Sequence, residues 1–324
     1  MLKMVQEELE TSLGQGRIRV DASLAPYTTF HIGGPARLLV EPRSTAELVA
    51  ALRIVQNYGV RHFVLGMGAN ILVGDRGFDG VVIRNTVRDF RVHPSGRLHA
   101  AGGAIVWPDI IRETTRAGWS GLEHFAGIPS TIGGALWQNL HFLSPAPKRE
   151  RTVFLDEIVV QAELLGGDGT VRTEDHSWFR FGYDYSMLHD TDDIVLEATF
   201  QLTAASPDDM QRVIEENLAW RAERHPPLDT EPSAGSIFRK IDGVGAGRLI
   251  DECGLKGTRI GGAEITHRHA NIMINRGGAT ARDVRRLIAH VRERVERETG
   301  HKLIPEIMFV GEFIEEDSNT GDDV

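Results

Sequence analysis

Two glycine-rich segments are the first places in this sequence where chemistry could be done. Gly66 to Asn70 follows an apolar run, and Ala126 to Ala135 contains three glycines and a proline. Neither is a known nucleotide fingerprint, because Ile71 stands where a dinucleotide motif needs its third glycine, and no Gly-Lys-Ser/Thr occurs. Glycine lets backbone N–H groups approach a phosphate closely. Two such turns about 55 residues apart favour a long ligand such as a dinucleotide, although glycine turns also form for structural reasons alone.

Ser236 and Glu306 are the side chains best suited to handling a proton. Ser236 matches neither the nucleophile elbow nor a Ser-x-x-Lys pair, since Arg239 stands at the third position after it. A hydroxyl can still donate a proton beside a group that stabilises the charge, and an ordinary turn residue is the alternative. Glu306 lies in the apolar run Leu303 to Ile307, so it is either an inward-facing acid with a partner or an exposed edge-strand residue beside Pro305.

The remaining reactive side chains indicate no metal site. His267 and His269 fall on one face of a predicted strand, but no third ligand is spaced to complete a metal centre. Cys253 is the only cysteine, so no intramolecular disulfide can form, and we interpret it as a small buried residue.

Helices and strands alternate irregularly around these residues. N-terminal caps, apolar periodicity and closing glycines predict helices at 44–59, 108–118, from 206 onward and at 280–299. Apolar, β-branched runs predict strands at 60–68 with its glycine turn, 80–85, 159–166 and 193–202.

Composition limits the class of protein and its partners. The 324 residues carry a formal net charge of −10, which argues against a nucleic-acid partner. The N-terminus lacks the apolar region of a signal peptide, and no apolar run approaches the roughly 20 residues that span a bilayer. We therefore expect a soluble, cytoplasmic monomer with no membrane partner. Residues 313–324 read as a frayed acidic tail.

In their order along the chain, these segments resemble the UDP-N-acetylenolpyruvoylglucosamine reductase family. The chain reads close to T-T-F-x-I-G-G-P-A, G-x-G-S-N-L-L-V, G-L-E-x-x-A-G-I-P-G-T-V-G-G-A, P-S-A-G-S-x-F, A-G-x-L-I-x-x-x-G-L-K-G and G-x-A-x-[IV]-[ST]-x-x-H-A-N-x-x-x-N. The matching segments are 27–36, 66–80, 121–139, 232–238, 246–257 and 261–275. Each motif is weak alone, but six in order cover about 27–310, nearly the whole chain.

The resemblance implies an α+β fold. It consists of a FAD-binding domain of the PCMH/vanillyl-alcohol-oxidase type, made of two subdomains, and a C-terminal α+β substrate-binding domain. The lack of a long insertion in the substrate domain resembles the shorter, type II form. The boundaries that we expect are 1–26 for a lead-in helix, 27–204 for the FAD domain (subdomains about 27–87 and 88–204), 205–312 for the substrate domain and 313–324 for the tail.

The resemblance also implies a reaction. NADPH reduces non-covalently bound FAD, and a hydride passes from flavin N5 to C3 of UDP-N-acetylglucosamine enolpyruvate; C2 is protonated, which gives UDP-N-acetylmuramate for peptidoglycan synthesis. Because negative charge develops on C2 and the adjoining carboxylate, the site needs a proton donor and cationic or hydrogen-bonding groups.

Residue roles follow from the same resemblance. Ser236 matches the proton donor, Glu306 the catalytic glutamate, and Tyr183 and Arg239 are expected to bind substrate. His31, in the opening motif, is expected to be structural because the family does not attach its flavin covalently. The residues that match the flavin-binding turns are Gly66, Met67, Gly68, Ala69, Asn70, Ala126, Gly127, Ile128, Pro129, Thr131, Gly133 and Gly134.

Four departures from the family pattern stand out. Asp184 occupies the position of the catalytic arginine in the motif Y-R-x-S, and a carboxylate cannot supply that cation; Arg180, four residues earlier, is the replacement that we predict. Leu140-His141 stands where Ala-Gly is usual. Phe238-Arg239-Lys240-Ile241 stands where the family has Phe-Lys-Asn-Pro, so the asparagine is lost while a positive residue remains at 239. Ala69 replaces a serine, which removes a side-chain donor but no backbone donor.

Two other functions fit part of this pattern. A related FAD-dependent oxidase or dehydrogenase with a different small substrate is the first alternative, and the departures at Asp184 and Lys240 favour it. The second is a non-catalytic nucleotide-binding or scaffold protein, which would be colourless because it holds no flavin.

Overall fold

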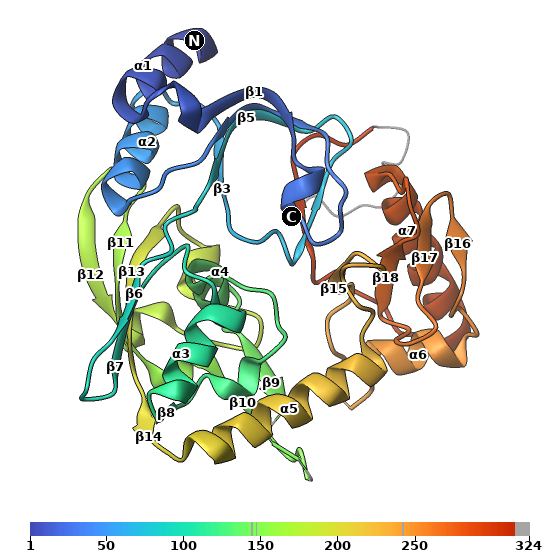
Figure 1. The fold of residues 1–324 in the computed structure, drawn as a ribbon. Coiled ribbons are helices and arrows are strands. Elements are labelled where there is room, and N and C mark those ends of the chain that lie inside the picture. Colours follow the sequence, from blue (N-terminus) through green and yellow to red (C-terminus); the bar gives the residue numbers. More distant parts are fainter. Residues whose placement is uncertain (144, 147, 242, 315–324) are drawn as a thin grey trace. The chain divides into compact units, whose positions relative to one another are not determined.

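The structure is a computed structural model that describes residues 1–143, 145–146, 148–241 and 243–314 (Figure 1). By its internal contacts the chain forms two compact units. Unit 1 comprises Met1–Arg19, Leu39–Met67 and Val81–Arg221, and unit 2 comprises Val20–Leu38, Gly68–Gly80 and Ala222–Val324. Among the residues so described, no helix combines the length and the apolar character needed to cross a membrane.

A five-stranded antiparallel sheet forms the centre of unit 1. Its order is β12-β11-β13-β7-β6. The strands span Val171–Asp175, Val159–Leu165, Ile194–Gln201, Arg97–Ala101 and Phe90–Val92. The strands predicted at 159–166 and 193–202 are β11 and β13, and they pair with each other from Val159–Phe200 to Leu165–Ile194.

A second sheet has the order β1-β2-β5-β3. Its strands span Ile18–Ser23, Pro35–Val40, Phe78–Arg84 and His62–Leu65. Strands β3 and β5 pair in parallel, which confirms the strands predicted at 60–68 and 80–85. Two short antiparallel pairs complete unit 1: β9 (His141–Leu143) with β10 (Thr152–Phe154), and β8 (Trp119–Ser120) with β14 (Thr203–Ala204).

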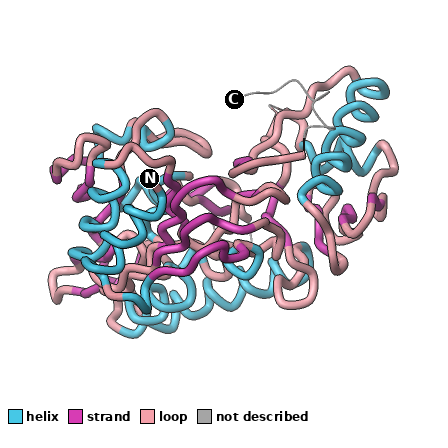
Figure 2. The backbone as a smooth tube through the Cα atoms, turned by 90° about the horizontal axis from the view of Figure 1, so that it is seen from above, coloured by secondary structure: helices cyan, strands magenta, loops and turns pink. Residues whose placement is uncertain are grey.

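Five α-helices accompany these sheets among the described residues, and Figure 2 shows how helix and strand alternate along the backbone. They are α1 (Leu2–Leu13), α2 (Thr45–Asn57), α3 (Ile111–Arg116), α4 (Ile132–Trp137) and α5 (Pro207–Arg224). The cap predicted for α2 is confirmed, since the Glu47 N–H donates to Ser44 Oγ at 3.2 Å. Helical backbone begins at Pro108, as expected, because Trp107 is the only non-helical residue in the π-turn Val106–Ile110, and α3 continues that turn.

Unit 2 contains a four-stranded antiparallel sheet in the order β15-β18-β17-β16. The strands span Ser233–Ser236, Ile272–Asn275, Ala263–Ile265 and Arg259–Ile260. The helices are α6 (Ala246–Glu252) and α7 (Ala281–Thr299). Strand β4 (Ile71–Val73), which follows the first glycine turn, pairs in parallel with β19 (Met308–Val310) near the end of the described chain.

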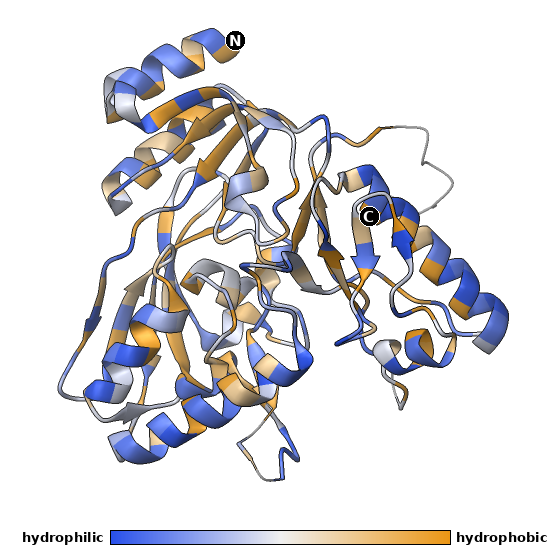
Figure 3. Cartoon of the chain, turned by 45° about the vertical axis from the view of Figure 1, so that its right-hand side comes forward, coloured by the Kyte–Doolittle hydropathy of each residue, from blue (hydrophilic) through white to orange (hydrophobic). Residues whose placement is uncertain are grey.

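Helix α7 confirms its prediction in detail. Thr280 caps it in a capping box with Asp283, and Gly300 ends it with a φ of 75°. Figure 3 shows hydrophobic and hydrophilic residues alternating along this helix. Its apolar side is fully or almost fully buried. The Asp75 carboxylate accepts the N–H groups of Ala281 and Arg282 at 2.7 and 2.9 Å, so a residue just after the first glycine turn anchors the start of α7.

Unit 1 continues past residues 204 and 205, where the sequence predicts a domain break. It extends to Arg221, because Ile214 of α5 lies in the core of unit 1 and Trp220 packs against that core. The segments Val20–Leu38 and Gly68–Gly80 belong to unit 2, whose core includes Phe30 and Leu72. Long-range packing, which the order of motifs does not reveal, therefore divides the chain.

Candidate active site

The first glycine turn presents a row of unused backbone donors. In the described part of the chain, none of the N–H groups from Gly66 to Asn70 donates to a protein acceptor. The carbonyl groups of the turn are nevertheless held: Gly68 accepts the Thr29 N–H at 3.1 Å, and Asn70 accepts the Met308 N–H at 3.0 Å. Adjacent unpaired N–H groups in a fixed turn form an anion-binding surface.

Within unit 1, the second glycine turn meets Gly66, the first residue of the first turn. A Cβ atom added to Gly66 would lie 2.6 Å from Thr131 Oγ1, so the two turns touch at these residues. The second turn is itself fixed, because the Gly133 N–H donates to Gly102 O at 2.7 Å and the Ile132 N–H donates to Ala104 O at 2.9 Å. The sequence could predict two glycine turns, but only the fold brings them together.

Unpaired donors also occur on the second turn. Within the described residues, the N–H groups of Ser130 and Thr131 have no acceptor, although Thr131 is only 2% exposed. Leaving a buried N–H without a partner costs about 1–3 kcal/mol. A ligand phosphate that accepts these N–H groups would remove that cost, so the residues present fit the pyrophosphate of a dinucleotide.

A half-buried cation beside the second turn was missed by the sequence analysis. A Cβ atom on Gly127 would lie 3.2 Å from Cδ and Nε of Arg221. Burial lowers the pKa of Arg221 to about 10, and its guanidinium lies 5.7 Å from the centre of the Phe142 ring. Among the described residues no carboxylate forms an ion pair with Arg221. This arginine is therefore available to an anionic ligand. The sequence feature that could have identified it is its position next to Trp220, at the partly apolar end of α5.

In unit 2, Thr29 joins three of the predicted motifs. Its N–H donates to Gly68 O, and its Oγ1 donates to Ser233 O at 2.7 Å. The Ser233 N–H donates back to Thr29 O at 3.0 Å. Asn275 Nδ2 donates to Phe30 O at 3.2 Å. The opening motif thus fixes the first glycine turn beside the segment that carries Ser236.

Ser236 and Glu306 lie on adjacent backbone segments. The Glu306 N–H donates to the carbonyl of Ile237, the residue after Ser236, at 2.7 Å. Both side chains are partly exposed. Gly235 has a φ of 76° at an irregularity in the pairing of β15, a conformation that favours glycine and turns the end of the strand. The structure therefore places the two predicted proton-handling residues on neighbouring backbone segments.

Asn271 holds this segment in place, a role that the sequence analysis did not predict. Its Oδ1 accepts the Phe238 N–H at 3.0 Å, and its Nδ2 donates to Phe238 O at 2.8 Å. Its own carbonyl accepts the Ile237 N–H at 2.8 Å. Because the oxygen and the nitrogen of the Asn271 amide both bond to the backbone of Phe238, the side chain holds that residue rigidly. The H-A-N motif was the sequence feature that could have indicated this role.

Arg180 lines a separate open pocket of unit 1. It follows a 3₁₀ turn (His176–Phe179) with a φ of 45°, and its exposed side chain shares the pocket with Glu174 and Trp178. Neither Asp184 nor the glycine turns line this pocket.

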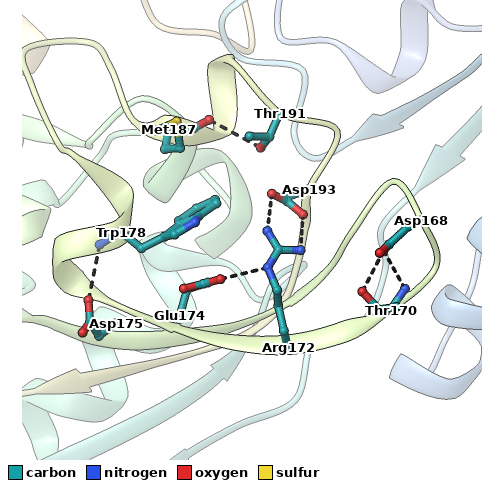
Figure 4. Close-up of polar contacts among 9 residues, drawn as sticks. All are labelled: Asp168, Thr170, Arg172, Glu174, Asp175, Trp178, Met187, Thr191 and Asp193. Carbon is teal, nitrogen blue, oxygen red and sulfur yellow. Dashed lines mark hydrogen bonds and ion pairs between the residues drawn. The ribbon is translucent and has the colours of Figure 1, made fainter.

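An ion-pair cluster includes Glu174, one of the residues that line the pocket (Figure 4). Arg172 contacts both carboxylate oxygens of Asp193 at 2.7 and 2.6 Å and Glu174 at 2.9 Å. The Asp193 and Glu174 carboxylates raise the pKa of Arg172, and its guanidinium lies over the Trp178 ring. The charges of this cluster neutralise one another, so we assign the cluster a structural role.

The aligned position of the family's arginine lies in a different cluster of unit 1. Asp184 lies in the turn Gly182–Tyr185 with a φ of 54°, and its Oδ1 is 3.8 Å from His141 Nδ1. The Tyr183 ring, half exposed, packs against the His141 ring with centroids 4.5 Å apart. Asn139 Nδ2 donates to Gly182 O at 3.0 Å and fixes the turn.

Arg239 is exposed in unit 2, and its N–H donates to Ile304 O at 2.9 Å. His269, one of the two histidines considered as metal ligands, has a structural contact: its Nδ1 accepts the Asn271 N–H at 3.2 Å. Burial lowers the pKa of His269. Burial likewise raises the pKa of the Cys253 thiol. In the described ranges, no three His, Cys, Asp or Glu side chains are grouped as metal ligands.

Comparison with known protein families assigns both parts of the chain. Residues 36–174 match the FAD binding domain family, and residues 226–310 match the family described as UDP-N-acetylenolpyruvoylglucosamine reductase, C-terminal domain. The first match covers the second glycine turn and most of unit 1. The chain is therefore an α+β protein with a FAD-binding domain, as expected.

Individual relatives narrow this class. UDP-N-acetylenolpyruvoylglucosamine reductase of Trichormus variabilis is 36% identical over 301 residues, covering 91% of this chain and 87% of the relative. Reductase 1 of Bacillus thuringiensis is 37% identical over 315 residues, covering 96% and 100%. The crystal structure of the Thermus caldophilus reductase superposes with a TM-score of 0.74 at 31% identity, covering 90% of this chain and 99% of that one. The chain belongs to the UDP-N-acetylenolpyruvoylglucosamine reductase family.

Proposed function

We propose that this protein reduces UDP-N-acetylglucosamine enolpyruvate to UDP-N-acetylmuramate in peptidoglycan precursor synthesis, with FAD as its cofactor and NADPH as the reductant. The names of its relatives support this reaction. Among the structural features, the adjacency of Ser236 and Glu306 through the Ile237 carbonyl carries the proposal. Protonation of a carbanion requires a positioned proton donor.

The two glycine turns are proposed to hold FAD, which, when bound, accepts a hydride from NADPH and supplies it from N5 to C3 of the enolpyruvyl group. The unpaired N–H groups of Gly66 to Asn70, Ser130 and Thr131 support this assignment, because they suit the oxygen atoms of a pyrophosphate. The flanking residues Ala126, Ile128 and Pro129 shape the second turn, and Gly133 and Gly134 let its backbone approach closely.

Ser236 is proposed to donate its hydroxyl proton to C2, and Glu306 to act as the second proton-handling group. The electron pair left at C2 after addition at C3 forms the new C–H bond with that proton. While the charge is spread over C2 and the carboxylate, nearby donors stabilise it. Tyr183 and Arg239 are proposed to bind the substrate, and Arg180 is the cation that the sequence alone nominates for the carboxylate.

The half-reactions test this proposal. Under anaerobic conditions, NADPH should bleach the flavin absorbance of the purified protein, and UDP-N-acetylglucosamine enolpyruvate should then restore it. Reduction without restoration would favour a flavin-dependent dehydrogenase with another substrate. A colourless protein that binds no added FAD would exclude the cofactor assignment.

We further propose a cytoplasmic monomer, since NADPH and a nucleotide sugar are both cytoplasmic reactants. Sedimentation equilibrium should give a mass near 35.8 kDa. Twice that mass would contradict the monomer.

A further inference from the structure

Two departures from the family pattern that lie far apart in the sequence meet in unit 1. Asp184 replaces the arginine of Y-R-x-S, and His141 replaces the glycine that usually follows Asn139 by two residues. In the structure, His141 Nδ1 and Asp184 Oδ1 are 3.8 Å apart, and their side chains are 19% and 10% exposed. A lost cation and a gained imidazole at one place indicate an exchange of charge between the two positions.

The surroundings of His141 fix the orientation of its ring. Nδ1 donates to Asn139 O at 3.1 Å, since a carbonyl oxygen can only accept, and Asp184 faces the same nitrogen. The ring is also packed between aromatic neighbours, with centroids 4.5 Å from Tyr183 and 5.1 Å from Phe154. In the residues that the structure describes, Nε2 has no hydrogen-bond partner.

A histidine held in this way differs from an ordinary surface histidine. With Nδ1 committed to the backbone, the imidazolium form has one remaining N–H, on Nε2, with which to contact an anion. The Asp184 carboxylate, 3.8 Å from Nδ1, is placed to keep the ring from rotating. In its imidazolium form, His141 can therefore direct a charged N–H from the place of the family's arginine.

We infer that His141, oriented by Asp184, supplies the positive charge for the carboxylate of the enolpyruvyl substrate that arginine supplies in the family motif. The inference rests on the proposed reaction. His141 is the residue that contacts substrate, and Asp184 is a positioning residue that acts through it. Arg180, the replacement expected from the sequence, instead lines a separate open pocket with Glu174 and Trp178.

The test measures the two half-reactions of the FAD-loaded protein separately. His141→Gln should leave reduction by NADPH unchanged and slow reoxidation by UDP-N-acetylglucosamine enolpyruvate about 100-fold, the typical effect of removing one donor to a developing oxyanion. It should also weaken equilibrium binding of the product UDP-N-acetylmuramate, which keeps the carboxylate. His93→Gln, an exposed histidine that bonds to Ser95, is the matched control and should behave as wild type.

Asp184 is tested by non-additivity and by rescue. Asp184→Asn should slow reoxidation about tenfold, Asp184→Glu should recover most of that loss, and Asp184→Asn added to His141→Gln should cause no further loss. The double substitution His141→Gly with Asp184→Arg restores the family residues and should bring reoxidation back toward the wild-type rate.

Several outcomes would overturn the inference. Wild-type reoxidation and product binding in His141→Gln would do so, as would an equal loss of both half-reactions, which indicates a folding role. Arg180→Gln reproducing the substrate-specific loss while His141→Gln does not would assign the cation to Arg180. If wild-type protein is reduced by NADPH but never reoxidised by the substrate, the proposed function fails as well, and this result is distinct from the others.

Discussion

The glycine turns of the proposed cofactor site and the segment around Ser236 use their backbone in opposite ways. On the turns, the N–H groups of Gly66 to Asn70, Ser130 and Thr131 are left without protein acceptors. Around Ser236, the N–H groups of Ser233, Ile237 and Phe238 are all bonded within unit 2. The first region therefore offers backbone donors to a ligand, whereas the second offers side chains.

This difference explains where the chain departs from its family. Ala69, on the first turn, lacks a hydroxyl but keeps its N–H, so a backbone-based site loses little. At Asp184 the side chain is the functional group, and its replacement requires a compensating residue such as His141. A backbone site is sensitive to added volume, and a side-chain site is sensitive to the identity of the residue. The following predictions test that contrast.

The largest effect is expected from Ser236→Ala. Loss of a proton donor should slow the reoxidation of reduced flavin by UDP-N-acetylglucosamine enolpyruvate about 100- to 10,000-fold, while reduction by NADPH stays at the wild-type rate. Stopped-flow absorbance of the two half-reactions measures both rates. Equal loss in both would show that Ser236 is not the C2 donor.

Glu306→Gln should act on the same half-reaction with a smaller effect, about 100-fold, since the hydroxyl donor remains. The substitution keeps the size of the side chain and the backbone bond to Ile237 O. Normal single-turnover reoxidation in this variant would remove Glu306 from the chemistry.

Asn271→Ala should lower the free energy of unfolding by about 2–4 kcal/mol, because both backbone groups of Phe238 lose a buried partner. Urea unfolding in the presence of FAD measures this change. The exposed Asn57, in the last turn of α2, provides the control Asn57→Ala. A stability equal to that of the control would mean that the amide does not support the Ser236 segment.

The smallest effect is expected from Gly66→Ala. The new Cβ would meet Thr131 Oγ1 at 2.6 Å, and the stiff threonine also caps α4 through the Gly134 N–H. Relief of that overlap should cost about 1–3 kcal/mol, or roughly 5- to 150-fold in FAD affinity. Fluorescence titration of the apoprotein measures it. Gly16→Ala, where an added Cβ meets nothing within 4 Å, is the control. Unchanged FAD affinity in Gly66→Ala would show that the two turns can accommodate the added methyl group.

Much of the fold could be predicted from local signals. The caps of α2 and α7 and the apolar runs of β11 and β13 depend on neighbouring residues, and each was confirmed. The extension of unit 1 through Arg221 could not be predicted, because it depends on the packing of α5 against the core of that unit. Asn271 and Arg221 were missed for the same reason.

The sequence by itself determined the family, the types of side chain at 236 and 306, and the two glycine turns, since these depend on residue identity and order. Tertiary structure alone decided that Gly66 touches Thr131, that Glu306 lies beside Ile237 and that His141 faces Asp184. Each of these contacts joins residues more than 40 positions apart. Such contacts are fixed by the burial of apolar residues in the two cores, which no local pattern encodes.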